Sequence, residues 1–203
     1  TTNPNGGGMW RKNRKDNGVP GCIGVDLNRN YGYMWGYDNN GSSPDPCEGN
    51  YRGESAFSEP ETAAIRDFCE SHEFKIALNY HTYGSYLLYP WGFTPDPCPD
   101  DALLNAYSVL MIQDNNYLNG PGNTTIYNTN GGSDDWMYGD QTTKGKILSY
   151  TPELGGDNDG FWCPIDRIIP IAQENMIQNL LMAAFAGSYG EVVDLSPTVT
   201  NQT

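Results

Sequence analysis

Short apolar runs that alternate with longer segments of helical periodicity restrict the fold of this chain more than any other feature. Each run is rich in aliphatic and aromatic residues and is too short for a helix, so each predicts a strand. His81 follows directly after the second run, and residues at strand ends are common functional positions in α/β folds. The predicted strands cover residues 21–25, 75–80, 86–89 and 146–150.

Longer segments between these runs have apolar residues at helical spacing. Ser58-Glu-Pro-Glu61 has the signature of a capping box with proline in the first turn, and Ile65, Phe68 and Cys69 continue the apolar face to about His72. Strands that alternate with helices predict an α/β domain with a mixed, mostly parallel sheet covered by helices. The other helices are predicted over residues 100–117 and 164–186.

Length and charge limit the number of domains and the kind of partner. At 203 residues the chain is long enough for one sizeable core, and we expect one domain over residues 1–187 and a linker or disordered tail over 188–203. No apolar run reaches the eighteen residues of a membrane-spanning helix, and no signal peptide is visible. A net charge of −14 argues against nucleic acid and anionic membranes as partners.

The five cysteines indicate an oxidising compartment. Cys22 and Cys47 flank a polar, Gly-rich segment, and a disulfide between them would close a loop of about 26 residues and stabilise the fold by about 3 kcal/mol. Cys69 lies on the apolar face of a predicted helix and is expected to be a buried free thiol. Cys98 and Cys163 remain as a second possible pair, which is the weaker expectation. We therefore expect a secreted or extracytoplasmic protein.

Seven side chains have the chemistry of a functional site, although each also has an ordinary structural explanation. A single histidine is most often a core or surface imidazole, and a carboxylate after a strand can belong to a structural ion pair. The arginines and the asparagine can be solvated or turn residues, the tyrosine a packed aromatic, and the aspartate a helix N-cap. The seven are His81, Glu153, Arg11, Asn28, Arg29, Tyr127 and Asp134.

The order and spacing of six motifs favour the functional explanation. They are Met-Trp-Arg-Lys-Asn-Arg (9–14), Gly-Val-Asp-Leu-Asn-Arg-Asn (24–30), Asn-Tyr-His-Thr-Tyr (79–83), Leu-Leu-Tyr-Pro-Trp-Gly (87–92), Ile-Tyr…Gly-Gly-Ser-Asp-Asp-Trp (126–136) and Thr-Pro-Glu-Leu-Gly (151–155). Together they resemble the zinc carboxypeptidases related to pancreatic carboxypeptidases A and B and bacterial carboxypeptidase T. The resemblance extends from about residue 1 to Ala186 and corresponds to the later part of that family's catalytic domain. It implies an α/β fold with helices on both faces of a mixed, mostly parallel sheet.

The resemblance also implies a metallopeptidase site. In the family a catalytic zinc is held by two histidines and one glutamate, which leaves a position for water. His81 matches the last of these ligands, and Asp26 matches a carboxylate that orients a ligand histidine through its other ring N–H. Glu153 matches the general base, and Arg11 matches the cation that polarises the scissile carbonyl and stabilises the developing oxyanion.

An exopeptidase must in addition recognise a free terminal carboxylate. The resemblance assigns this to Arg29, whose planar fork can bind a carboxylate through two hydrogen bonds, and to Asn28, which donates a further one. Tyr127 matches a mobile tyrosine that closes over the bound terminal residue, and Tyr83 belongs with the substrate-binding residues. Asp134 matches the floor of the pocket for the terminal side chain, where a carboxylate favours lysine or arginine.

One departure from the family bears on activity. The family's other two zinc ligands come from a His-x-x-Glu motif that precedes the six motifs, and this chain contains none, because His72 is followed by Glu-Phe-Lys and His81 by Thr-Tyr-Gly. We therefore expect an absent N-terminal part, a monomeric parent enzyme that acts on peptide C-termini, and little activity from this chain alone. The alternatives are a non-catalytic module that binds peptide carboxylates or cell-wall peptides, and an adhesion domain without a ligand.

Overall fold

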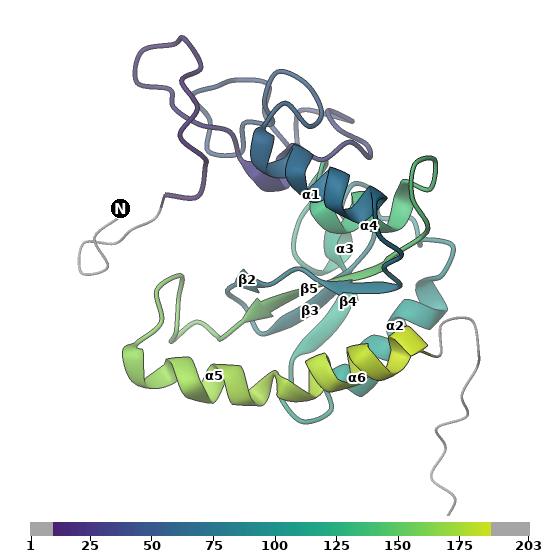
Figure 1. The fold of residues 1–203 in the computed structure, drawn as a ribbon. Coiled ribbons are helices and arrows are strands. Elements are labelled where there is room, and N and C mark those ends of the chain that lie inside the picture. Colours follow the sequence, from purple (N-terminus) through teal and green to yellow (C-terminus); the bar gives the residue numbers. More distant parts are fainter. Residues whose placement is uncertain (1–9, 188–203) are drawn as a thin grey trace, which may run out of the picture.

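A mixed sheet forms the centre of the molecule (Figure 1). The structure is a computed structural model that describes residues 10–187. Within this range the sheet has five strands in the order β1-β5-β3-β4, and β2 also pairs with β5. The strands are β1 (Ile76–Leu78), β2 (His81–Thr82), β3 (Tyr86–Tyr89), β4 (Leu118–Pro121) and β5 (Leu148–Leu154).

The pairing is mostly parallel. β5 runs parallel to both β1 and β2, β4 runs parallel to β3, and β3 is antiparallel to β5. The longest of these strands, β5, is buried from Leu148 to Pro152. A strand buried on both faces must be covered by other elements on both faces. The predicted mixed, mostly parallel sheet is therefore confirmed.

Helices cover both faces of the sheet (Figure 1). On one side lie α1 and α4; on the other lie α2 and α6, which contact each other, together with α5. α4 contacts β5, and α6 contacts β1. The helices are α1 (Pro60–Glu70), α2 (Asp101–Met111), α3 (Gly122–Thr125), α4 (Ser133–Gly139), α5 (Ile168–Glu174) and α6 (Met176–Gly187), with short 3-10 helices η2 (Leu27–Arg29) and η3 (Ile165–Arg167).

The apolar core divides between the two faces. One cluster packs Leu87, Leu104 and Tyr150 with residues of α2 and α6, and Tyr107 stacks on Phe185 at a centroid distance of 4.0 Å. A second cluster centres on Trp136 of α4, with Tyr31, Cys69 and Ile147 around it. Burial of these aromatic and aliphatic side chains stabilises the sheet.

Several predicted elements are confirmed and others are wrong. β3 has the predicted bounds, whereas β1 is shorter than the predicted strand over 75–80. Residues 21–25 form no strand: their only β-bridge within residues 10–187 joins Ile23 to Asp16, and Gly24 N and Val25 O make backbone hydrogen bonds to Lys15 and Asn13. The helix predicted over 164–186 is divided into η3, α5 and α6, with Asn175 between the last two. β4, α3 and α4 lie in segments whose many Gly, Asn and Asp residues mask the pattern.

The predicted capping box before α1 does not form. The N-cap residue is Glu59, and its side chain makes no capping hydrogen bond. Its carboxylate instead accepts a hydrogen bond from Ser58 Oγ at 2.7 Å and is buried in a polar network described below. Ile65 and Phe68 were expected on the apolar face of this helix, but their side chains are 40% and 51% exposed. Helical periodicity alone therefore misplaced two of the three residues of that face.

One of the two predicted disulfides forms. Cys22 and Cys47 form a disulfide, and Cys69 is a buried free thiol, as expected. The proposed Cys98–Cys163 bond is wrong, because both cysteines are free. Cys98 belongs to the apolar core cluster of α2 and β3, whereas Cys163 lies half-exposed in the loop before η3. The expected position of Cys98 and Cys163 in loops therefore did not show that the two cysteines lie close together.

The ends of the chain fall partly outside the described residues. Residues 188–203, predicted as a linker or tail, lie in that part, so the predicted boundary after residue 187 stays a prediction. Among residues 10–187 no helix is both long and apolar enough to cross a membrane.

The disulfide assignment predicts the reactivity of the thiols. Alkylation of the denatured, unreduced chain should label three cysteines, Cys69, Cys98 and Cys163, and prior reduction should raise the number to five. In the native chain Cys163 should react first, because burial raises the pKa of the Cys69 and Cys98 thiols and only the thiolate reacts. Mass spectrometry of the alkylated peptides measures this. A single labelled cysteine in the unreduced chain would contradict the assignment.

Candidate active site

A cleft of about 1010 Å³ opens where β2 and β5 end. The parallel pairing of these strands makes His81 and Glu153 register partners, so the two side chains lie beside each other. Of the nine residues that the resemblance assigns to the site, seven line this cleft, whereas Arg29 and Asp134 do not. The seven are Arg11, Asp26, Asn28, His81, Tyr83, Tyr127 and Glu153.

Glu153 and His81 are both partly desolvated. Burial raises the pKa of Glu153 to about 7; the neighbouring Asp134 adds to this, and the cations Arg11 and Arg29 oppose it. Burial lowers the pKa of His81, so its imidazole is neutral at pH 7. A carboxyl group that titrates near neutrality is suited to accept and return a proton. A neutral imidazole keeps one ring nitrogen free to act as a ligand or acceptor.

Arg11 reaches the cleft from an irregular segment and pairs with Asp26. Its Nη2 lies 3.0 Å from Asp26 Oδ2, and the Asp26 side chain is almost fully buried while that of Arg11 is half-exposed. Asp26 Oδ1 also accepts a hydrogen bond from Asn28 N at 3.2 Å, which caps η2. Within this chain Asp26 therefore orients an arginine, and its expected role toward a ligand histidine stays a prediction.

Asn28 and Arg29 lie in η2 but face different surroundings. Asn28 Oδ1 accepts a hydrogen bond from Ser133 N at 2.9 Å, and its Nδ2 lies 3.4 Å from His81 Nε2. The Arg29 side chain is buried behind the cleft wall, where Nη1 donates to the carbonyl oxygen of Asn28 at 2.7 Å. Its Nε has no hydrogen-bond partner, and no carboxylate of residues 10–187 pairs with it.

Asp134 lies in the first turn of α4, close behind the cleft. Its Oδ2 accepts a hydrogen bond from Thr151 Oγ1 at 3.2 Å, and its Oδ1 accepts one from Asp135 N at 2.9 Å. The alternative that Asp134 caps this helix is wrong, because α4 begins at Ser133 and its N-cap is Gly132. The charge of Asp134 acts on both His81 and Glu153, as their pKa shifts show.

Aromatic rings form the outer rim of the cleft. Tyr127 follows α3 and is 55% exposed, and Tyr83 meets Phe161 edge to face at a centroid distance of 4.8 Å. Trp10 and Phe161 also line the cleft and were not predicted from the sequence. Trp10 lies within the first motif beside Arg11, which was the available signal. Phe161 lies in an Asp-Gly-Phe-Trp loop with no periodicity, so nothing in the sequence marked it.

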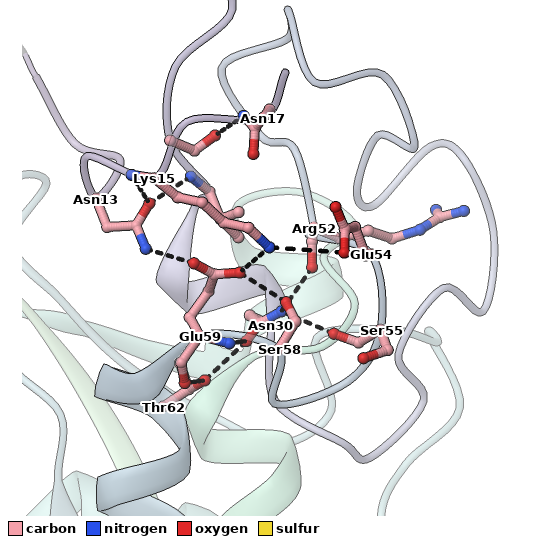
Figure 2. Close-up of polar contacts among 12 residues, drawn as sticks. Asn13, Lys15, Asn17, Asn30, Arg52, Glu54, Ser55, Ser58, Glu59 and Thr62 are labelled. Atoms are coloured by element: carbon pink, nitrogen blue, oxygen red, sulfur yellow. Dashed lines mark hydrogen bonds and ion pairs between the residues drawn. The ribbon is translucent and has the colours of Figure 1, made fainter. Parts of the chain in front are cut away.

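The two segments that supply the cations are joined by a buried polar network outside the cleft (Figure 2). The Glu59 carboxylate accepts hydrogen bonds from Asn13 Nδ2 at 2.6 Å, from Lys15 Nζ at 3.2 Å and from Ser58 Oγ. Asn13 Oδ1 in turn accepts one from Val25 N at 2.8 Å. Gly24 is required here, because a Cβ at this positive φ would clash with the Asn13 carbonyl oxygen.

Asn30 completes the network on the side of η2 (Figure 2). Its Nδ2 donates to the Arg52 and Ser55 carbonyl oxygens at 2.8 and 3.0 Å, and its Oδ1 accepts from Thr62 Oγ1 at 2.7 Å and from Glu59 N. Asn30 is fully buried, and a buried amide with every hydrogen bond made is rigid. The network therefore fixes the loop of residues 24–30 and the segment of Arg11 against α1.

The described residues supply only part of a metal site. Among residues 10–187 no group of three or more His, Cys, Asp and Glu side chains could hold a metal ion. His81 offers one imidazole nitrogen toward the cleft, whereas a catalytic zinc needs about three protein ligands. The residues present therefore do not hold zinc without further ligands.

Removal of the Glu59 charge should weaken the network measurably. We expect Glu59→Gln to lower the free energy of unfolding by about 1 to 3 kcal/mol, because the amide removes the buried negative charge that pairs with Lys15 and turns a donor toward Asn13. The control is Glu54→Gln, whose exposed carboxylate lies 3.8 Å from the same lysine and should change stability by less than about 0.5 kcal/mol. Urea denaturation measures both, and equal losses would contradict the assignment.

The stability lost in Glu59→Gln should depend on pH. Burial alone would raise the pKa of Glu59, but hydrogen bonds from Ser58, Asn13 and Lys15 outweigh it and hold the pKa below the usual 4.5. A lowered pKa contributes stability above the unfolded value that is lost as pH falls through the folded value. The difference in the free energy of unfolding between wild type and Glu59→Gln, measured by urea denaturation, should therefore be constant near neutrality and shrink below about pH 4.5.

Comparison with known proteins places this geometry in one family. The zinc carboxypeptidase profile matches residues 2–178. Carboxypeptidase B of Astacus astacus is 39% identical over 82% of this chain and 56% of its own length, and carboxypeptidase A1 of Bos taurus is 38% identical over 83% and 41%. The chain thus spans about half the length of these relatives.

Solved structures agree with this assignment. Bovine thrombin-activatable fibrinolysis inhibitor, in complex with tick carboxypeptidase inhibitor, superposes with a TM-score of 0.79 at 29% identity, over 88% of this chain and 62% of that one. Carboxypeptidase A from Helicoverpa armigera gives a TM-score of 0.78 at 32% identity, over 91% and 48%. With the sequence profile, the cleft at the ends of β2 and β5 and these shared folds, the chain belongs to the zinc carboxypeptidase family.

Proposed function

We propose that this chain is part of a zinc metallocarboxypeptidase that releases the last residue of a peptide. The observation that carries the proposal is the parallel register of β2 and β5, which sets a neutral imidazole beside a carboxyl group of near-neutral pKa. Arg11 lines the same cleft. A proton acceptor, a metal ligand and a cation around one cavity suit hydrolysis of an amide bond.

Glu153 is proposed as the general base. Its pKa of about 7 matches the working range in which a carboxylate can take a proton from water and return it to a leaving amine. Arg11 is proposed to stabilise the negative charge that develops on the scissile carbonyl oxygen. Its pairing with Asp26 holds the guanidinium at the cleft, and the half-exposed side chain leaves donors free to face a substrate.

Arg29 and Asn28 are proposed to recognise the terminal carboxylate. A buried guanidinium with an unpartnered Nε gains most from an anion that can accept its hydrogen bonds. We infer that Arg29 turns into the cleft when the substrate carboxylate enters and gives up its contact with the Asn28 carbonyl oxygen. Tyr127, exposed at the rim, would then cover the terminal residue of the substrate. Tyr83 and Phe161 would contact the substrate residues that precede the terminal one.

The proposal requires two zinc ligands beyond the described residues. His81 would supply one ligand, and the other two would come from a segment that precedes the six motifs, as in the family pattern. Zinc bound there would polarise a carbonyl group and lower the pKa of water. The residues of this chain would position the substrate and transfer protons around it.

The remaining parts of the proposal concern the setting of the enzyme. The disulfide suits an oxidising compartment, so we propose a secreted or extracytoplasmic, monomeric protein whose partners are peptide or protein C-termini. A non-catalytic module that binds peptide carboxylates is the competing function. It would use Arg29 and Asn28 but would not need Glu153.

Metal content and turnover test the function together. The chain alone should bind zinc poorly and hydrolyse nothing, whereas the chain joined to its upstream coding sequence should carry about one zinc per molecule and cleave peptides with a free C-terminus. In the restored protein Glu153→Gln should keep the zinc and lower kcat roughly 10²- to 10⁴-fold. Metal analysis and peptide assays measure both. Tight stoichiometric zinc in the chain alone would overturn the ligand proposal, and carboxylate binding without turnover in the restored protein would favour the binding module.

Asp134 should set the preference for the terminal residue. A carboxylate close behind the cleft favours an incoming lysine or arginine, because a partly buried charge is costly unless it is paired. In the restored enzyme Asp134→Ile should shift the ratio of kcat/KM for peptides ending in Arg and in Phe at least about tenfold toward Phe. Asp134→Asn, which keeps the size and an acceptor for Thr151, separates charge from shape. An unchanged ratio in both variants would mean that the carboxylate does not act on the substrate.

A further inference from the structure

A turn after β3 connects two functional segments through its backbone. The turn consists of Trp91, Gly92 and Phe93, and its amide groups are bound by Asp135 of α4. Gly92 N donates to Asp135 Oδ1 at 2.9 Å, and Phe93 N donates to Asp135 Oδ2 at 3.2 Å. Asp135 is 1% exposed, and within residues 10–187 its carboxylate accepts hydrogen bonds from these two backbone amides alone. Its hydrogen bonds therefore serve only to hold the turn.

The carbonyl groups of the same turn hold both ends of the loop that carries Tyr127. Trp91 O accepts a hydrogen bond from Asn123 N at 2.9 Å. Gly92 O accepts one from Thr129 N at 2.8 Å and one from Asn123 Nδ2 at 3.1 Å. Tyr127, on the stretch between these two anchors, lines the cleft with an exposed ring. The loop is thus tied to one turn on both sides of Tyr127, and Asn128 Nδ2 adds a hydrogen bond to Asp38 Oδ2 at 3.0 Å.

The absence of a side chain at Gly92 makes this arrangement possible. A Cβ on Gly92 would clash with Thr129 Oγ1 and would approach Asp135 Oδ2 to 3.4 Å. The turn therefore lies in direct contact with one anchor of the loop and with the carboxylate that holds it. A displacement of the turn by a few tenths of an ångström would be transmitted to Thr129, because closely packed groups move together.

We propose that Asp135 is a positioning residue for Tyr127. By binding the amides of the turn, it fixes the two anchors of the 123–129 loop and so sets where the Tyr127 ring stands at the cleft. The anchoring follows from the contacts of this chain alone. Its consequence for substrate binding rests on the proposed function.

Asparagine at this position is an informative replacement. Asp135→Asn has the same shape, but its side chain offers one acceptor oxygen and turns an NH₂ group toward one of the two backbone donors. A buried donor without an acceptor costs free energy, so the turn should loosen. Asp140→Asn at the C-cap of the same helix is the matched control, because Asp140 contacts Trp136 and Thr142 and does not reach the turn.

Hydrogen exchange tests the anchoring on this chain without any activity. In Asp135→Asn the amides of Asn123 and Thr129 should exchange about tenfold faster or more, together with those of Gly92 and Phe93, while Asp140→Asn should leave all four unchanged. Faster exchange at Gly92 and Phe93 with no change at Asn123 and Thr129 would overturn the proposal, since the loop would then be anchored without the turn.

A measurement on the unmodified chain covers the case in which the variant does not fold. The four amides should open as one unit, with the same opening free energy and the same dependence on low denaturant. Opening of Asn123 and Thr129 at much lower free energy than Gly92 would contradict the proposal.

The restored enzyme supplies a separate test of the consequence. Tyr127→Phe should weaken substrate binding in the wild type and have little further effect in Asp135→Asn, so the two changes should be non-additive in KM. Additive effects together with coupled exchange would sink the link to Tyr127 and leave the anchoring intact. If the restored protein proved inactive, the proposed function would fail while the exchange result would still decide the anchoring.

Discussion

The parallel register of β2 and β5 is the constraint on which the site depends. Because His81 pairs with Glu153, each residue is fixed relative to the other by backbone hydrogen bonds rather than by a loop. The rest of β5 is buried between helices, so a shift of one residue would turn its core side chains outward. The position of the carboxylate is therefore protected by the packing energy of the whole sheet, and only its protonation depends on the local surroundings.

The cations are positioned by a different principle. Arg11 and the η2 segment lie in irregular chain, where a few backbone hydrogen bonds, such as those between Asn13 N and Val25 O and between Gly24 N and Lys15 O, are supplemented by buried polar side chains. Glu59 and Asn30 hold the two segments against α1 with bonds that are nearly all satisfied. The disulfide between Cys22 and Cys47 restrains the long loop that it closes. Irregular backbone can thus be as well positioned as a strand where its buried polar groups are paired.

Features that depend on residues close together in the sequence could be predicted, whereas features that depend on distant contacts could not. Strand β3 rests on a local apolar run, and the placing of His81 and Glu153 in one site rests on motif order, so both were accessible, whereas the pairing of β2 with β5 was not predicted. Residues 21–25 are as apolar as a strand, but within residues 10–187 their only β-bridge joins Ile23 to Asp16. A motif shows which residue types occur together, but it does not show which way each side chain turns. Arg29 was therefore expected in the cleft, whereas its side chain is buried behind it. Contacts far apart in sequence, such as Glu59 with Asn13, leave no periodic pattern at all.

Adjacent acids at the start of α4 show how one helix end can serve two purposes. Side chains at successive helix positions point about 100° apart, so Asp134 and Asp135 face different surroundings despite being neighbours. Asp135 is enclosed by backbone donors of the turn after β3, whereas Asp134 contacts Thr151 of β5 and acts on the charges of the cleft. The electrostatic coupling between the two raises the pKa of Asp135 further than burial alone. Replacing Asp134 by an apolar residue would therefore alter the cleft and at the same time favour the ionised form of Asp135, which is the form that accepts both backbone hydrogen bonds. A change of charge preference at residue 134 can thus arise without loosening the loop that carries Tyr127.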